Sequence, residues 1–120
     1  MATFSKVLLS GSTYGKQVKV AATATAGTTI HATGTSATIL DEIWIYAVNS
    51  SASSVKLTFE WGEATAPDGN IEVTVLPEAG LVTVVPGFLL QGNASAKVVR
   101  AFAGTANVIL LHGFVNRITA

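Results

Sequence analysis

The chain has 120 residues, and its seven basic and seven acidic side chains give a formal net charge of zero at pH 7. This length suits one domain with one modest core. Charged residues make up 12% of the chain, about half of the usual share of roughly 25%. A protein with such a surface has little long-range electrostatic attraction to nucleic acid or acidic lipid. Its molecules also repel one another only weakly. We therefore expect a permanent or near-permanent assembly.

No cysteine is present, which excludes disulfides, thiolate catalysis and cysteine-based zinc sites. For so small a domain this absence favours folding inside a cell. The apolar stretch at residues 7–9 is too short for the core of a signal peptide. Unbroken apolar runs of only a few residues are also too short for a membrane-spanning helix, so we expect no membrane partner.

Apolar and polar residues alternate along the N-terminal part of the chain, which predicts strands at residues 4–9 and 16–22 with a turn between them. Residues 1–10 are expected to form a docking arm or an edge strand. The stretch 21–38 is rich in Ala, Thr, Gly and Ser. It predicts a loop, or a flat edge strand around residues 28–32, because β-branched threonine favours extended backbone.

The strongest predicted strand is residues 39–49, which carries large apolar side chains on both faces. This pattern predicts a central strand that is covered on both sides. Residues 55–61 alternate cleanly, and a short serine-rich connection precedes them. The two strands are therefore predicted to form a β-hairpin.

Further strands are predicted in the C-terminal half, and the Pro86-Gly87 pair is expected to end one of them, before a short apolar stretch at residues 88–90. Eight or nine short strands with turn signals about every ten residues predict an all-β antiparallel sandwich, jelly roll or small barrel, as a single domain over residues 1–120. The C-terminal strands are predicted at residues 71–76, 81–85, 96–102 and 107–115.

Histidine chemistry is sparse, because His31 and His112 are the only two imidazoles. His112 shares a strand face with apolar residues, which predicts a packed, hydrogen-bonded side chain. His31 lies in the threonine-rich stretch and is expected at the surface or at an interface. Two distant histidines without cysteine indicate no metal site. A histidine pair joined by Asp41 or Glu42 remains an alternative that the sequence leaves open.

The carboxylates show no catalytic spacing. Glu60 and Glu72 could face each other on neighbouring strands, as a glycosidase would require, but both fall on stripes that we expect to be solvated. Residues 68–70 predict a turn and not a calcium loop. Residues 11–17 resemble a phosphate-binding loop, but the glycine spacing is one residue short and Gln17 replaces the magnesium-binding hydroxyl. The sequence thus predicts a protein that is not an enzyme, with no cofactor and no catalytic residue.

Basic residues occur only as short pairs and form no stripe, so we expect no direct contact with nucleic acid. The aromatic residues are more informative, because Trp and Tyr concentrate binding energy at subunit contacts. Core packing is expected for most of them, and a subunit contact for one or two. The candidates for an interface are Trp44, Tyr46, Trp61 and Phe88.

Four phrases resemble small virion proteins of tailed bacteriophages, and together they span most of the chain. They are VLLSGST at residues 7–13, DEIWIYAVN at 41–49, SASSVKLTFEWG at 51–62 and HGFVNRI at 112–118. Proteins of this kind include head decoration, or cement, proteins. The resemblance does not distinguish a head protein from a tail component.

The resemblance implies a jelly-roll-like β-sandwich, often trimeric, that binds the major capsid protein and reinforces the outer head. Such a protein is made in the host cytoplasm and is located in the virion, and the family supplies no catalytic residue. One alternative is a structural subunit of the tail, baseplate or fibre. The other is a carbohydrate-binding β-sandwich, which would need exposed aromatic residues such as Trp44 or Trp61 on one open face.

Overall fold

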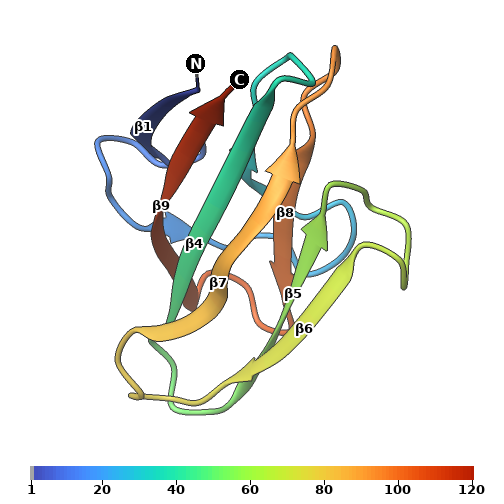
Figure 1. Ribbon diagram of the computed structural model, residues 1–120. Coiled ribbons are helices and arrows are strands. Elements are labelled where there is room, and N and C mark those ends of the chain that lie inside the picture. Colours follow the sequence, from blue (N-terminus) through green and yellow to red (C-terminus); the bar gives the residue numbers. More distant parts are fainter. Residues whose placement is uncertain (1) are drawn as a thin grey trace.

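The computed structural model describes residues 2–120, which form nine β-strands in two packed antiparallel sheets (Figure 1). The order of the five-stranded sheet is β1-β9-β4-β7, with β2 also paired to β9, and that of the four-stranded sheet is β3-β8-β5-β6. The predicted antiparallel sandwich of eight to nine strands is confirmed. The strands are β1 (Thr3–Leu8), β2 (Val18–Lys19), β3 (Thr28–Ala32), β4 (Ile39–Asn49), β5 (Val55–Trp61), β6 (Asn70–Val75), β7 (Val82–Gln91), β8 (Val98–Ala103) and β9 (Ile109–Thr119).

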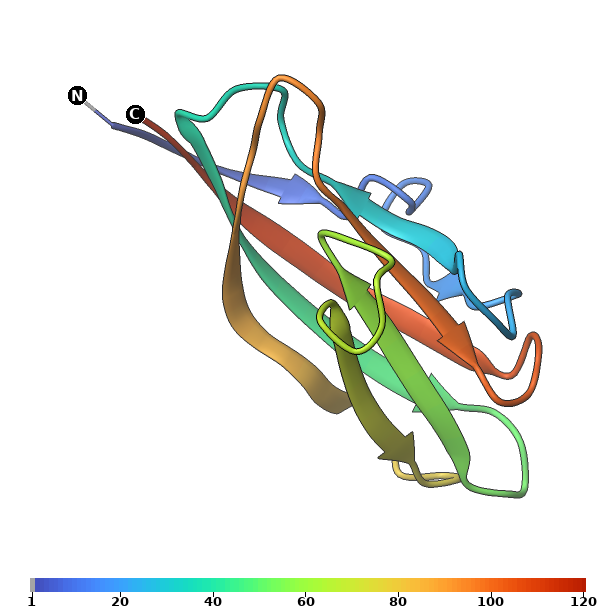
Figure 2. The ribbon, with the colours of Figure 1, turned by 90° about the vertical axis from the view of Figure 1, so that its right-hand side faces the viewer.

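The strand pairs are nested along the chain. β1 and β2 pair with β9, β3 with β8, β4 with β7, and β5 with β6. This nesting describes one long antiparallel ribbon that turns back between β5 and β6. Because β4 also pairs with β9 and β5 with β8, the ribbon is rolled into two sheets, which is the arrangement of a jelly roll. Figure 2 views the sandwich from the side of the four-stranded sheet, with the strands of the five-stranded sheet behind it.

One hydrophobic core lies between the sheets. Ile43 and Ile45 of β4 and Leu57 and Phe59 of β5 are fully buried members of it. Each such side chain contributes about 1.5–3 kcal/mol through its removal from water. A slip of one residue in either strand would expose this inward set, so burial specifies the register of both strands.

The predicted hairpin of residues 39–61 is wrong, although both of its strands exist. β4 belongs to the five-stranded sheet and β5 to the four-stranded sheet, so the connection crosses from one layer to the other. Buried Asn49 stabilises this crossing, because its Nδ2 donates to the carbonyl oxygens of Ser53 and Val75 at 2.8 Å each. Facing layers let both inward apolar stripes cover each other, which neighbouring strands of one sheet cannot do.

Pro86 and Gly87 do not end a strand, as had been expected, but lie within β7. β7 is an edge strand, where the missing N–H of a proline costs no ladder hydrogen bond. The pairing with β4 shifts between Phe88 and Pro86, so Gly87 is the extra residue of a β-bulge. Its φ of 82° is one that glycine adopts without steric cost.

The N-terminal part of the chain runs along the other edge of the five-stranded sheet. β1 and β2 both pair with β9 and do not pair with each other, so the turn predicted between them closes no hairpin. The strand predicted at 16–22 is only two residues long. Between β1 and β2 the chain leaves the sheet, and the Gly11 N–H donates to the Ile30 oxygen of β3 at 2.9 Å. This segment thereby links the edges of the two sheets.

The remaining predictions agree with the structure to within a few residues. The strand that had been an alternative at residues 28–32 is present as β3, at the edge of the four-stranded sheet. β9 extends beyond its predicted end to Thr119, where it pairs with both β1 and β4. The first and last described residues therefore lie at the same end of the sandwich (Figure 1).

Candidate functional site

Exposed large hydrophobic side chains gather along the two edges of the five-stranded sheet. Phe4 of β1 is 72% exposed and Leu89 of β7 is 56% exposed. No exposed large hydrophobic residue of the described chain lies on the strands of the four-stranded sheet. The exposed apolar surface on strands therefore lies at the two opposite edges of the five-stranded sheet. At the β1 edge it comprises Phe4, Leu8 and Tyr14, and at the β7 edge, with the turn that precedes it, Leu76, Leu81, Phe88 and Leu89.

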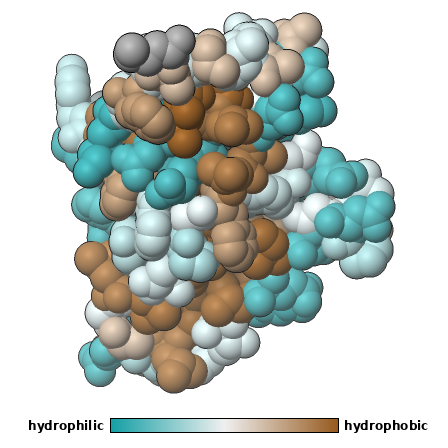
Figure 3. Space-filling view, in the orientation of Figure 1, coloured by the Kyte–Doolittle hydropathy of each residue, from teal (hydrophilic) through white to brown (hydrophobic). Residues whose placement is uncertain are grey.

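An aromatic group lies between these edges on the outer face of the five-stranded sheet. Trp44 of β4 and Phe114 of β9 are paired in register, and their ring planes differ by 12° with centroids 6.2 Å apart. The Lys6 ammonium lies 5.0 Å from the Phe114 centroid, within the range of a cation–π attraction. On this side, hydrophobic surface runs from the upper to the lower part of the molecule, beside paler and hydrophilic surface (Figure 3).

The structure brings the four predicted interface residues together in two pairs. Trp44 and Tyr46 point to the outer face of β4 and are half-buried among their neighbours. The prediction that β4 is covered on both sides is therefore wrong, although β4 is central in its sheet. Trp61 and Phe88 lie elsewhere, with their rings edge to face at 6.2 Å and 86°. Trp61 packs against the core, while Phe88 is 47% exposed at the β7 edge.

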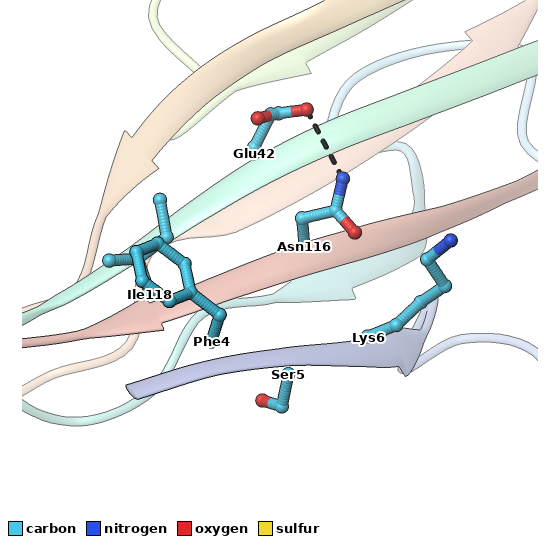
Figure 4. Close-up of a pocket in the computed structure, with 6 residues that line it drawn as sticks. All are labelled: Phe4, Ser5, Lys6, Glu42, Asn116 and Ile118. Carbon is cyan, nitrogen blue, oxygen red and sulfur yellow. Dashed lines mark hydrogen bonds between the residues drawn. The ribbon is translucent and has the colours of Figure 1, made fainter. Parts of the chain in front are cut away.

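A depression of about 340 Å³ lies between β1, β9 and β4 on the same outer face (Figure 4). β1 contributes Phe4 and Lys6, β4 contributes Glu42, and β9 contributes Asn116 and Ile118. Ser5 also lines its rim, but its side chain lies on the opposite side of the β1 ribbon from Asn116. The depression thus combines an aromatic ring, a carboxylate, an amide and an ammonium group.

The Glu42 carboxylate is held in place by two donors. Its Oε1 accepts from Trp44 Nε1 at 2.6 Å and from Asn116 Nδ2 at 3.2 Å. These hydrogen bonds, first that from Trp44 and then that from Asn116, lower the pKa of Glu42. The carboxylate is therefore ionised at neutral pH, and its second oxygen receives no hydrogen bond from residues 2–120.

A polar cluster that the sequence did not predict lies in the interior, between the sheets. Asp41 of β4 is fully buried, and its Oδ2 lies 2.7 Å from Nε2 of buried His31 on β3. Arg117 of β9 donates to Asp41 through Nε at 2.8 Å and Nη2 at 2.9 Å. The expectation that His31 is a surface or interface residue is wrong, because its bonds to Asp41 and to Ser10 satisfy it inside the protein. The alternative of a histidine joined to Asp41 is correct for His31 alone.

The hydrogen bonds of His31 determine its tautomer. Nδ1 accepts a hydrogen bond from the backbone N–H of Ser10 at 3.0 Å, so the proton is on Nε2 and faces Asp41. Burial is the main cause that lowers the pKa of His31, against the opposing effect of Asp41. Burial would also raise the pKa of Asp41, but hydrogen bonds from Arg117 and His31 together lower it below its ordinary value. The cluster therefore consists of neutral imidazole, carboxylate and guanidinium.

This cluster differs from a nucleophilic triad in its geometry. In a Ser–His–Asp triad a hydroxyl meets the imidazole nitrogen that is not bonded to the carboxylate. Here a backbone N–H of Ser10 occupies that nitrogen, and the Ser10 hydroxyl instead accepts from the Ala32 N–H at 2.7 Å. His31 and Asp41 are also closed to solvent. The arrangement joins β3, β4 and β9 and leaves no imidazole lone pair to act as a base.

His112 and Glu60 are placed differently from their predictions. His112 lies on the outer face of β9 but is exposed, and so is not packed as had been expected. Glu60, predicted to be solvated, is 1% exposed. Its carboxylate accepts from the Gly27 N–H at 2.7 Å and from the Thr25 hydroxyl, because the segment before β3 folds over it. Glu72 is exposed as predicted, in an ion pair with Lys56 at 2.8 Å.

Residues 11–17 form turns, with positive φ at Tyr14 and Gly15. Across residues 2–120, no three His, Cys, Asp or Glu side chains lie close enough to hold a metal ion. No helix in the same part of the chain could cross a bilayer.

Comparison of the chain with protein-family models, with curated proteins and with solved structures finds no match.

Proposed function

We propose that this protein is a non-catalytic virion protein of a tailed phage, which binds the outer head and stabilises the shell through protein–protein contacts. The observation that carries the proposal is the placement of the exposed hydrophobic side chains at both edges of one sheet, such as Phe4 and Leu89. Exposed apolar surface of this kind marks sites of association. Two separate edges suit a protein that touches more than one neighbour, as a head protein does where capsid subunits meet.

Further support comes from the fold, the charge and the resemblance. The jelly-roll sandwich is the architecture that the resemblance to decoration proteins implies. A net charge of zero leaves little long-range repulsion against a partner. Many weak contacts, repeated over the shell, add through avidity. The proposed partners are the major capsid protein and two further copies of this chain, which together would form a trimer.

The test is binding of the purified chain to expanded capsids that lack it, measured by co-sedimentation. We expect saturable binding by the wild-type chain, and binding at least about tenfold weaker for Leu89→Asp, because a charge placed in an apolar contact must be desolvated. The control is Thr74→Asp, an exposed position of β6 that lies opposite Lys56. It adds the same charge on the other sheet and should bind like the wild type.

Two outcomes would overturn the proposal. One is absence of binding by the folded wild-type chain to any capsid form. The other is a cryo-EM map of the parent particle that shows the chain only in the tail or fibre, which would establish the alternative structural role. Native mass measurement tests the proposed trimer, for which we expect three times the mass of the chain. A stable monomer at micromolar concentration would show that trimers do not form before the chain binds the head.

A further inference from the structure

We propose that the depression between β1, β9 and β4 binds one ring of a neutral carbohydrate. Phe4 belongs both to this depression and to the apolar surface of the proposed head contact, but different variants test the two proposals. Its volume of about 340 Å³ lies at the lower end of the range for small-molecule sites, which suits a ligand of the size of a mono- or disaccharide. Its lining residues come from three neighbouring strands of one sheet, so a rigid scaffold positions them (Figure 4).

The apolar side of the site is an aromatic ring that is free to accept a ligand. Phe4 is 72% exposed and is the cross-strand partner of Ile118 on β9. An exposed phenylalanine held against a cross-strand neighbour offers a flat apolar surface at little cost in side-chain freedom. The C–H face of a pyranose is a flat apolar surface of matching size.

The polar side of the site offers two acceptors and one donor group. Glu42 Oε1 is already occupied, so Oε2 is left to accept, and the bonds from Trp44 and Asn116 hold the carboxylate in place before a ligand arrives. Asn116 donates its Nδ2 to Glu42, so its carbonyl oxygen also remains available to accept. The Lys6 side chain also lines the depression, and its ammonium group carries donors.

This pattern selects hydroxyl groups. A hydroxyl both donates and accepts, and neighbouring hydroxyls of a sugar ring present two donors close together, as two adjacent acceptors require. Successive N–H groups of an extended peptide point in opposite directions and do not match them.

The two charges of the site select a neutral ligand. Glu42 is ionised and Lys6 is cationic, and both line the same depression. An anionic ligand would meet the carboxylate, and a cationic ligand would meet the ammonium group. A neutral polyhydroxylated ligand meets neither repulsion and can bond to both groups.

The experiment is an NMR titration of isotope-labelled full-length chain with methyl glycosides of glucose, galactose, mannose and N-acetylglucosamine. The reporters are the side-chain amide of Asn116 and the indole N–H of Trp44. We expect at least one glycoside to shift both, with a Kd in the millimolar range that is typical of single weak contacts. Glu42→Gln and Phe4→Ala should each weaken this binding at least about tenfold.

The variants are chosen to separate binding from folding. Glutamine at position 42 keeps an oxygen that accepts from the Trp44 indole, but it loses the free anionic acceptor. Glu72→Gln makes a matched carboxylate change on the other sheet, and Leu81→Asp makes an apolar change just before β7, whose first residue pairs with Ala47 and not with Glu42. Both should bind sugar like the wild type. Glu42→Gln should also keep the capsid binding that Leu89→Asp weakens, so the two proposals can fail independently.

Three results would overturn the carbohydrate site. The first is that no glycoside shifts the reporters at about 100 mM, a concentration far above a millimolar Kd, while the chain remains folded. The second is that the shifts persist unchanged in both Glu42→Gln and Phe4→Ala. The third is that glycerol or a neutral peptide of similar size produces the same shifts as the best glycoside, which would show an unselective surface.

Discussion

The imidazole of His31 and the carboxylate of Asp41 join the two sheets across the interior, with Nε2 and Oδ2 2.7 Å apart. His31 belongs to the four-stranded sheet and Asp41 to the five-stranded sheet. Arg117 supplies the positive charge that balances Asp41, so His31 remains neutral. The sandwich thus contains a charged polar connection inside its hydrophobic core, and every buried side-chain polar atom among the described residues has a hydrogen-bond partner.

Asp41→Ala should be strongly destabilising. It leaves the Arg117 guanidinium and the His31 Nε2–H without their acceptor at a buried position, and breaking one partner of a buried pair costs about 3–5 kcal/mol. The measurement is the free energy of unfolding from urea denaturation. Glu72→Ala is the control, because it breaks an exposed ion pair with Lys56, which is worth at most about 1 kcal/mol. Equal losses for the two variants would contradict the structural role of Asp41.

Acid should destabilise the protein first through His31. Its pKa in the folded state lies below the ordinary value of 6.5, so the unfolded chain takes up a proton before the folded chain does. Stability is therefore fully present above pH 6.5 and falls as the pH drops from there toward the folded pKa. Protonation of Nδ1 also removes the acceptor of the Ser10 N–H. The measurement is the free energy of unfolding as a function of pH.

Two variants identify the source of this pH dependence. His31→Gln should lower stability at neutral pH and remove the decline that begins near pH 6.5. His112→Gln, at an exposed position, should leave that decline in place. Further declines should begin below pH 4.5 from Glu42 and below pH 3.8 from Asp41, because each carboxylate has a lowered pKa in the folded state and the unfolded chain takes up its proton first. A decline near pH 6.5 that survives in His31→Gln would refute the assignment.

Gly87→Ala should cost more stability than Gly80→Ala. Both glycines have positive φ, 82° and 72°, which costs an L-residue about 1–3 kcal/mol. At Gly87 an added Cβ would in addition meet the Trp44 ring at 2.7 Å, whereas at Gly80 it would meet nothing within 4 Å. Thermal unfolding of both variants measures the difference. An equal decrease in Tm would show that the bulge tolerates a side chain beside Trp44.

Glu60→Gln should loosen the segment that precedes β3. The Glu60 carboxylate accepts from the Gly27 N–H and the Thr25 hydroxyl, and an amide presents a donor in place of one of these acceptors. The expected cost is about 1–3 kcal/mol for one buried group left without its partner. Amide hydrogen exchange at Gly27 should become faster, while exchange in the middle of β4 changes only as far as global stability does. Unchanged exchange at Gly27 would show that Glu60 does not hold this segment.

The fold class and most of the strands could be predicted from the order of apolar and polar residues. Successive side chains of a strand point to opposite faces of the sheet. An alternating pattern therefore shows which residues face the core, because the apolar set lies on the buried face. The inward set of residues 39–49 and 55–61 could therefore be predicted without any knowledge of partners. Asp41 falls in the same phase as Ile43 and Ile45, which was a usable signal that its carboxylate is buried.

The pairing of the strands and the contacts between distant side chains could not be predicted in this way. Strands 39–49 and 55–61 have the same alternation whether they form a hairpin or face each other across a core. The second arrangement results from the nested pairing of strands far apart in the chain, as with Ile39 and Thr119. His31, Asp41 and Arg117 come from three such strands, so no local spacing connects them. The depression around Glu42 forms for the same reason, because long-range pairing brings β1, β9 and β4 together.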